Sequence, residues 1–116
     1  MSEQAIEIGD KLHIITRRRF EDDIRRHFIG EVIGISGELQ SVKGYAIVFN
    51  AASNDYEKRS DTRIRVFSLG QEGFIVNKIP RTVAIGSLEY RLVRGRLLVT
   101  DGANYSLDIN EFGSAR

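Results

Sequence analysis

The stretch HFIGEVIGISGELQSVKGYAIVFN, residues 27–50, decides the fold of this chain. Aromatic and β-branched residues dominate both of its halves and Gly37-Glu38 separates them, so the stretch predicts a long β-hairpin. Strand side chains alternate between two faces, and here one face would be bulky and the other small. The bulky face would carry Ile29, Ile33, Ile35, Tyr45, Ile47 and Phe49, and the small face Gly30, Val32, Gly34, Gly44, Ala46 and Val48. This contrast predicts a strongly bent sheet that closes on itself.

Shorter strands are expected on both sides of the hairpin. Residues 11–18, 62–69 and 74–79 are rich in β-formers, and Pro80 ends the last of them because proline cannot continue a sheet ladder. Residues 51–61 are polar and rich in turn formers, which predicts a loop or a wide hairpin connection.

The C-terminal third shows the clearest alternation of apolar and polar residues. It begins at Leu88, and Arg94-Gly95 and Asp101-Gly102 predict turns, the second of them a two-residue hairpin turn. Residues 81–87 fit either a short helix or an irregular crossover. The chain as a whole therefore predicts an all-β protein, a small antiparallel β-barrel or roll of seven to eight short strands with at most one short helix.

Length and composition favour one small domain. The 116 residues predict a flexible leader at 1–9, a single β-barrel domain at 10–112 and a flexible tail at 113–116. No apolar run approaches the roughly 20 residues of a membrane span, and the acidic N-terminus lacks the pattern of a secretion signal. We therefore expect a cytoplasmic protein with no membrane partner. The absence of cysteine excludes disulfides, thiolate metal sites and cysteine nucleophiles.

The arginines are the most suggestive functional feature. The formal net charge of +1 predicts no partner, but only four of the seventeen basic residues are lysine. The planar guanidinium fork suits phosphate better than the ammonium of lysine does. Two clusters flank the loop between the first two expected strands, and a third follows the hairpin. The candidate nucleic-acid-binding residues are Arg17, Arg18, Arg19, Arg25, Arg26, His27, Arg63 and Arg65.

Pairing of the first two strands would bring the first two clusters to one end of the barrel. Arginines gathered there, with aromatic residues nearby, could bind a nucleic-acid strand through phosphate contacts and stacking. The alternative is a solvated barrel end in which neighbouring acids neutralise the arginines. The interleaved acids are Glu21, Asp22, Asp23, Glu57 and Asp61.

Motifs for catalysis, metals and cofactors are not found. His13 and His27 have no metal-ligand spacing, and a lone histidine of this kind is most often a surface or hydrogen-bonded residue. The chain has neither a G-x-S-x-G nucleophile motif nor the Gly-Lys-Ser/Thr end of a phosphate loop. The sequence predicts no cofactor and no metal, and it leaves catalysis unsupported.

The segment GYAIVFNAASN, residues 44–54, resembles the first motif of the Sm-like RNA-binding family. Gly44, Phe49 and Asn54 match that motif, whereas Asn50 stands where the family has aspartate. The resemblance extends over residues 28–79, and the Arg-Gly pair of the second family motif is missing. It implies a small, highly bent barrel that forms rings, with Asn50 and Asn54 as the base-contacting candidates.

The hypothesis that these patterns favour is a non-catalytic β-barrel module that binds nucleic acid, specifically RNA, through its arginines. A second hypothesis is a protein-interaction or self-assembly module, a homo-oligomer among them. In that case Tyr45, Ile47 and Phe49 would fill the barrel, and the glycine-bearing face would let another backbone approach closely. A third is a barrel that holds a small ligand, although so small a barrel is usually filled by its own side chains.

Overall fold

The computed structural model describes residues 6–16, 26–50, 52–53, 55–70 and 73–109, and these form an all-β structure. The predicted class is therefore confirmed. The chain divides into two compact units, Met1–Arg81 and Thr82–Arg116. Among the described residues, no helix has the length and apolar character that crossing a membrane requires. The single domain proposed for residues 10–112 stays a prediction, and the residues expected as leader and tail lie mainly outside the described part.

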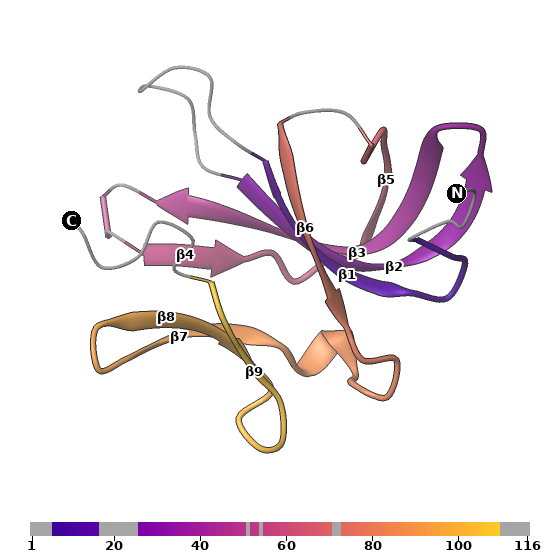
Figure 1. Cartoon of the computed structure of the whole chain (residues 1–116). Helices are drawn as coiled ribbons and strands as arrows, with labels where there is room; N and C mark the ends of the chain where they lie inside the picture. Colours follow the sequence, from indigo (N-terminus) through magenta and orange to yellow (C-terminus); the bar gives the residue numbers. More distant parts are fainter. Residues whose placement is uncertain (1–5, 17–25, 51, 54, 71–72, 110–116) are drawn as a thin grey trace. The chain divides into compact units, whose positions relative to one another are not determined.

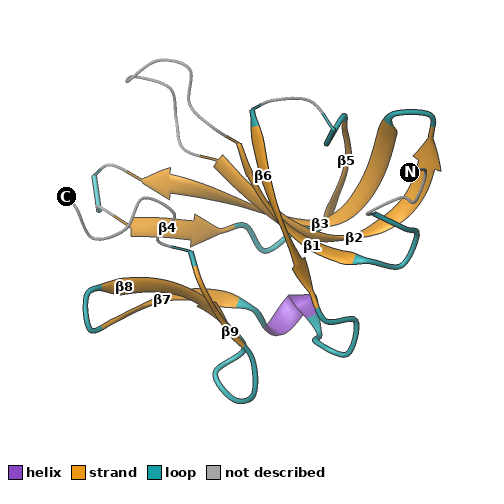
Figure 2. Cartoon of the chain, in the orientation of Figure 1, coloured by secondary structure: helices purple, strands orange, loops and turns teal. Residues whose placement is uncertain are grey.

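The first unit is built from one antiparallel sheet, which we name sheet A (Figures 1 and 2). Its strands are β1 (Lys11–Thr16), β2 (Arg26–Ser36), β3 (Leu39–Asn50), β4 (Asp55–Lys58), β5 (Arg63–Phe67) and β6 (Phe74–Ile79). The strand order is β4-β3-β2-β1-β6, and β5 also pairs with β3. The long hairpin predicted for residues 27–50 is confirmed as β2 and β3.

Two glycines produce the strong bend of this hairpin. Gly30 of β2 lies directly opposite Gly44 of β3. A Cβ atom on Gly44 would collide with the carbonyl oxygen of Ile29 and with the Cα of Gly30, and one on Gly30 would lie 2.7 Å from the carbonyl oxygen of Lys43. The two backbones approach more closely here than any side chain permits. Sheet A therefore curls, with one concave and one convex face (Figure 1).

The concave face encloses the hydrophobic core of the first unit. The core residues are Leu12, Ile14, Phe28, Val32, Val42, Ala46 and Leu69. None of Tyr45, Ile47 and Phe49 belongs to this cluster, so the prediction that they fill the barrel is wrong. They alternate with Ala46 and Val48 and therefore lie on the convex face, where Ile47 is also buried and Tyr45 and Phe49 are partly buried. The interior of a tightly bent sheet has the least room, and the glycine-bearing face takes that place up to Val32. A register shift between Val32 and Gly34 then turns Ile35 inward, where it packs against the core, so the predicted position of Ile35 on the other face is wrong.

An interrupted strand follows the hairpin. The sequence predicted only a loop or wide connection over residues 51–61, whereas β4 pairs with the end of β3 and β5 pairs with its beginning. Between the pairs Ile47–Lys58 and Gly44–Arg63, β3 contributes residues 45 and 46, whereas the segment between β4 and β5 contributes residues 59–62. The two extra residues form a bulge that separates β4 from β5.

The second unit is a small meander. Its strands are β7 (Glu89–Val93), β8 (Arg96–Thr100) and β9 (Ser106–Asp108), in the order β7-β8-β9, preceded by the 3-10 turn η1 (Ile85–Ser87). The predicted Arg94-Gly95 turn is confirmed, with φ angles of 55° and 80°.

The prediction of a two-residue turn at Asp101-Gly102 is wrong, because the loop between β8 and β9 spans residues 101–105. The Asp101 carboxylate accepts hydrogen bonds from the backbone N–H groups of Ala103 and Tyr105, at 2.8 and 3.0 Å. An aspartate that satisfies backbone donors in this way stabilises a longer loop.

Asp10, directly before β1, forms hydrogen bonds and an ion pair with residues at the end of β6. Its buried carboxylate accepts hydrogen bonds from Arg81 at 2.9 Å and from the Glu7 backbone N–H at 2.8 Å, and it pairs with Lys78 at 3.2 Å. Burial alone would raise the pKa of Asp10, but these donors outweigh burial and hold the pKa below its ordinary value of 3.8.

Replacing Gly44 with alanine is expected to lower the free energy of unfolding by roughly 3 kcal/mol or more, because the new methyl group collides with backbone atoms of β2. The matched control is Gly34→Ala, whose Cβ would lie 3.7 Å from the Cβ of Ser41, an ordinary contact. We expect this control to change stability by less than about 1 kcal/mol. Urea denaturation followed by circular dichroism measures both, and equal effects would contradict the role assigned to Gly44.

Replacing Asp10 with asparagine is expected to lower stability at pH 7 by about 1–3 kcal/mol, because charged hydrogen bonds are lost. The contribution of Asp10 is present above its unfolded pKa and is lost as the pH falls through the lower folded pKa. In urea titrations, the stabilities of parent and variant should therefore begin to converge only as the pH falls below about 4. Asp61→Asn, which breaks an exposed ion pair with Arg63, is the control and should cost less than about 1 kcal/mol.

Candidate functional site

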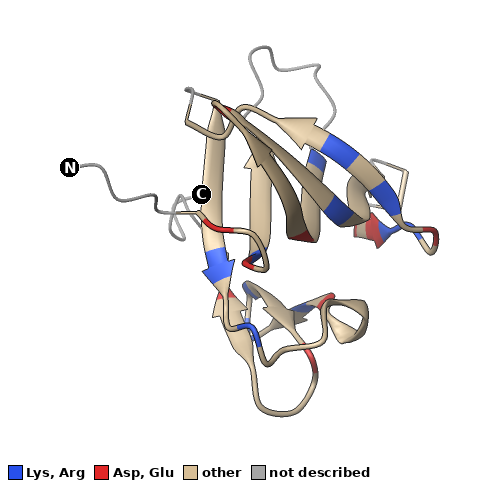
Figure 3. Ribbon diagram, turned by 90° about the vertical axis from the view of Figure 1, so that its right-hand side faces the viewer, with Lys and Arg blue, Asp and Glu red and all other residues tan. Residues whose placement is uncertain are grey.

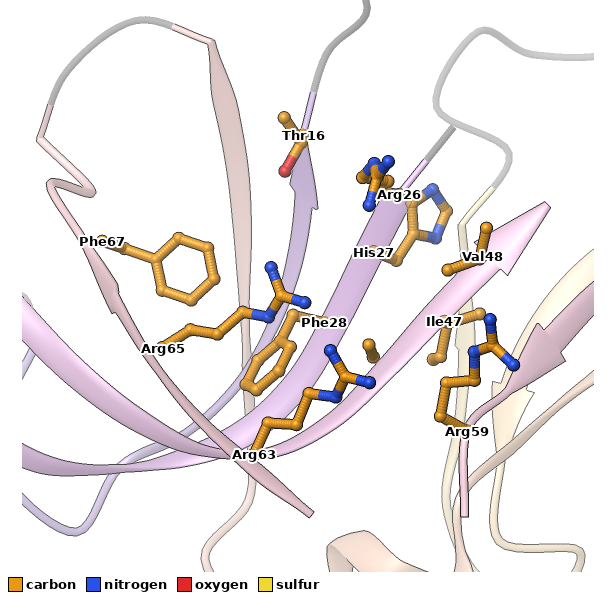
Figure 4. A pocket seen from close by; sticks show the side chains of 11 residues that line it. Thr16, Arg26, His27, Phe28, Ile47, Val48, Arg59, Arg63, Arg65 and Phe67 are labelled. Carbon is orange, nitrogen blue, oxygen red and sulfur yellow. The ribbon is translucent and has the colours of Figure 1, made fainter. Parts of the chain in front are cut away.

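A pocket of about 130 Å³ opens on sheet A between the hairpin and β5 (Figure 4). Side chains and backbone from β1, β2, β3 and β5, together with Arg59, form its wall. The lining residues are Thr16, Arg26, His27, Phe28, Ala46, Ile47, Val48, Arg59, Arg63, Arg65 and Phe67. Among the residues that the structure describes, four of the lining residues are arginines and none is an acid.

Strand alternation directs three of these arginines into the pocket. Arg26 is two residues before the buried Phe28 on β2, so both side chains lie on the concave face. On β5, Arg63 lies opposite Gly44 and Arg65 lies opposite Val42, both of which are concave-face positions. Since Gly44 has no side chain, the arginine opposite it lies over open backbone.

Arg59 reaches the same side through the bulge between β4 and β5. Its backbone N–H donates to the carbonyl oxygen of Ala46 at 2.8 Å, which places it opposite a concave-face residue. The bulge adds an even number of residues. The side chains of Arg59, Arg63 and Arg65 therefore point to the same face of the sheet before and after the bulge. Figure 4 shows the side chains of these arginines around the pocket.

The positive charge of the pocket is only weakly neutralised. Among the described residues, Asp61 alone forms an ion pair with one of these arginines, at 3.5 Å from Arg63 Nε, and both side chains are exposed. Glu57 instead accepts a hydrogen bond from Asn50. The Arg65 guanidinium lies 5.9 Å from the centre of the Phe28 ring, within cation–π range. Figure 3 marks the basic and acidic residues along the ribbon.

Four of the predicted site residues line the pocket: Arg26, His27, Arg63 and Arg65. The three arginines point to the concave side, whereas the ring of His27 packs against His13 and Tyr56. Pairing of Thr16 with Arg26 confirms that the ends of β1 and β2 lie side by side. Arg17, Arg18, Arg19, Arg25 and Asn54 lie outside the described residues. Sequence reasoning did not include Arg59, Phe28 and Phe67 in the site, because no local pattern shows that the bulge aligns Arg59 with β5.

Asn50 has a structural role in the turn after β3. Its Oδ1 accepts a hydrogen bond from the backbone N–H of Ala52 at 2.9 Å, and its Nδ2 donates to Glu57 at 2.9 Å. An asparagine that accepts from its own backbone two residues on is a common turn former. The role of Asn50 in base contact, which the Sm-like resemblance implies, stays a prediction.

A row of aromatic and polar rings lies on the convex face. The His13 and His27 rings are 5.5 Å apart edge to face, and His27 lies 4.9 Å from the Tyr56 ring. His13 is fully buried, and Asn77 Nδ2 lies 3.2 Å from its Nδ1. Burial and the neighbouring His27 lower the pKa of His13 to about 3. His13 is therefore a neutral interior residue. Among the described residues, no group of three or more His, Cys, Asp or Glu side chains could hold a metal ion.

Comparison with models of protein families, with curated protein sequences and with solved structures gives no match to this chain. The geometry of the pocket is therefore the basis for inferring a function.

The imidazole of His13 is expected to stay neutral down to about pH 4, because its pKa is lowered from 6.5 to about 3. The unfolded chain takes up this proton below pH 6.5, so stability should fall with decreasing pH by up to about 1.4 kcal/mol per unit. An NMR titration of the imidazole C–H signals measures this directly. Titration of His13 near pH 6.5 would contradict the assignment.

Proposed function

We propose that the concave face of sheet A binds single-stranded nucleic acid, with one backbone phosphate held in the pocket. The observation that carries this proposal is the convergence of Arg26, Arg59, Arg63 and Arg65 on one pocket whose described lining contains no acid. Like charges repel one another, so such a cluster gains most from an anionic ligand. Guanidinium groups match phosphate oxygens in two parallel hydrogen bonds.

The size of the pocket favours one phosphate group of a longer molecule. Its volume of about 130 Å³ is below the roughly 300–1,000 Å³ of sites that enclose a whole small ligand. This difference favours a polymer over the alternative of a barrel that holds a small ligand. A polymer can place one phosphate among the arginines and extend beyond the pocket along the sheet.

An aromatic wall beside the arginines favours a single strand. The Phe67 ring lines the pocket and is only partly buried, and it lies 5.6 Å from Phe28 and 5.7 Å from Phe74. Unpaired bases stack on aromatic side chains, whereas bases inside a duplex are not accessible for stacking. The resemblance of residues 44–54 to the Sm-like motif adds RNA as the preferred polymer.

Replacing Arg63 and Arg65 with glutamine is expected to weaken RNA binding at least about tenfold at low salt and to flatten the salt dependence, because fewer counterions are released. The control is Lys43→Gln. Lys43 lies between Arg63 and Arg65 in register, opposite Ile64, but on the convex face. The Lys43→Gln variant therefore removes a positive charge close to Arg63 and Arg65 without altering the pocket. Fluorescence anisotropy with mixed RNA and single-stranded DNA at several salt concentrations measures the effect.

Arg65→Lys separates bidentate recognition from simple charge, because lysine retains the charge and loses the planar fork. We expect its affinity to fall while the salt slope is kept. The proposal is refuted if the parent protein does not bind RNA. It is also refuted if the Lys43→Gln control loses as much RNA affinity as the Arg63→Gln/Arg65→Gln variant.

A further inference from the structure

Among the described strands, β5 lies at an edge of sheet A. One edge of β5 pairs with β3, and among the strands that the structure describes none pairs with the other. Such an edge presents backbone N–H and C=O groups that can pair with an added strand. β5 is therefore a place where sheet A can be extended by another chain.

The two faces of β5 carry different chemistry at this edge. Ile64 and Val66 are each 60% exposed on the convex side, whereas Arg63, Arg65 and Phe67 line the pocket on the concave side. A single exposed isoleucine would need no explanation. Two apolar residues on one side of an unpaired edge and two arginines on the other define which side chains an added strand must carry.

We infer that this edge binds an extended peptide whose side chains alternate between carboxylate and apolar groups, added as an antiparallel strand. Its carboxylates lie opposite Arg63 and Arg65, and its apolar residues lie opposite Ile64 and Val66. Opposite-charge and apolar pairs directly across two strands stabilise their pairing. The inference goes beyond nucleic-acid binding, and because both ligands use Arg63 and Arg65 they compete for the protein.

Repulsion between arginines disfavours a second copy of β5 as the strand added at this edge. Antiparallel pairing of β5 with its own copy about a two-fold axis through Arg65 would place the two Arg65 side chains opposite each other. Like charges directly opposite are destabilising in a sheet. An acidic strand replaces this repulsion with attraction and still covers Ile64 and Val66.

The test uses two peptides of one composition. In the order that faces residues 67 to 63, the matched peptide has the core Phe-Val-Glu-Val-Glu, and the permuted control has Glu-Glu-Val-Val-Phe. NMR titration of the labelled protein should shift and protect the backbone amides of residues 63–67 with the matched peptide. The permuted peptide should bind about tenfold more weakly, since several favourable cross-strand pairs are lost.

Two sets of variants separate the faces of the strand. The Arg63→Glu/Arg65→Glu variant should reverse the preference and favour a peptide with the core Phe-Val-Lys-Val-Lys. The Ile64→Thr/Val66→Thr variant keeps β-branched residues and removes most of the apolar surface, so it should weaken peptide binding several-fold and leave RNA binding unchanged.

The inference is overturned if the permuted peptide binds equally well, if the shifts map away from residues 63–67, or if Ile64→Thr/Val66→Thr leaves peptide affinity unaltered. Peptide binding at this edge without RNA binding would support the inference and remove only the proposed nucleic-acid function. RNA binding without peptide binding would support the proposed nucleic-acid function and overturn the inference about the β5 edge.

Discussion

The close approach of the two hairpin backbones at Gly30 and Gly44 is the constraint on which the rest of the first unit depends. Where a Cβ would meet the Ile29 carbonyl oxygen, only glycine fits, and β2 and β3 can curl together. The curl creates a concave face, and that face encloses the core of Val32, Val42 and their neighbours. The bend also sets the position of β5, because β5 pairs with β3 from residue 40 to residue 44.

The same bend determines where the positive charge gathers. Arg63 lies over Gly44, and Arg65 lies over Val42 beside the Phe28 ring. Small residues on β3 leave room for long arginine side chains, whose aliphatic stems can cover apolar surface while the charged ends meet in the pocket. Four guanidinium groups in one pocket repel one another, and Asp61 offsets only part of that repulsion. The excess of positive charge among the described lining residues is the reason for proposing a ligand-binding role for the concave face.

Much of the fold could be predicted from local patterns. The hairpin, its turn at Gly37 and the strand at residues 74–79 follow from alternation and from turn formers, and so does the facing of Arg63 and Arg65 away from Ile64 and Val66. Local patterns could not show which face of the hairpin is interior, because bulk alone favoured the wrong one. They also missed β4, whose short polar sequence becomes a strand only by pairing with the end of β3.

The amino-acid sequence by itself determined the all-β class, the long central hairpin and the alternation that separates arginines from apolar residues on β5, because strand period and turn chemistry are properties of neighbouring residues. Only the tertiary structure decided that the small face is interior, that His13 is buried beside His27, and that Arg59 joins the arginines of β2 and β5 in one pocket. These features depend on register, on the curvature at Gly44 and on the bulge between β4 and β5. Each of them arises from contacts between segments that are distant in the sequence.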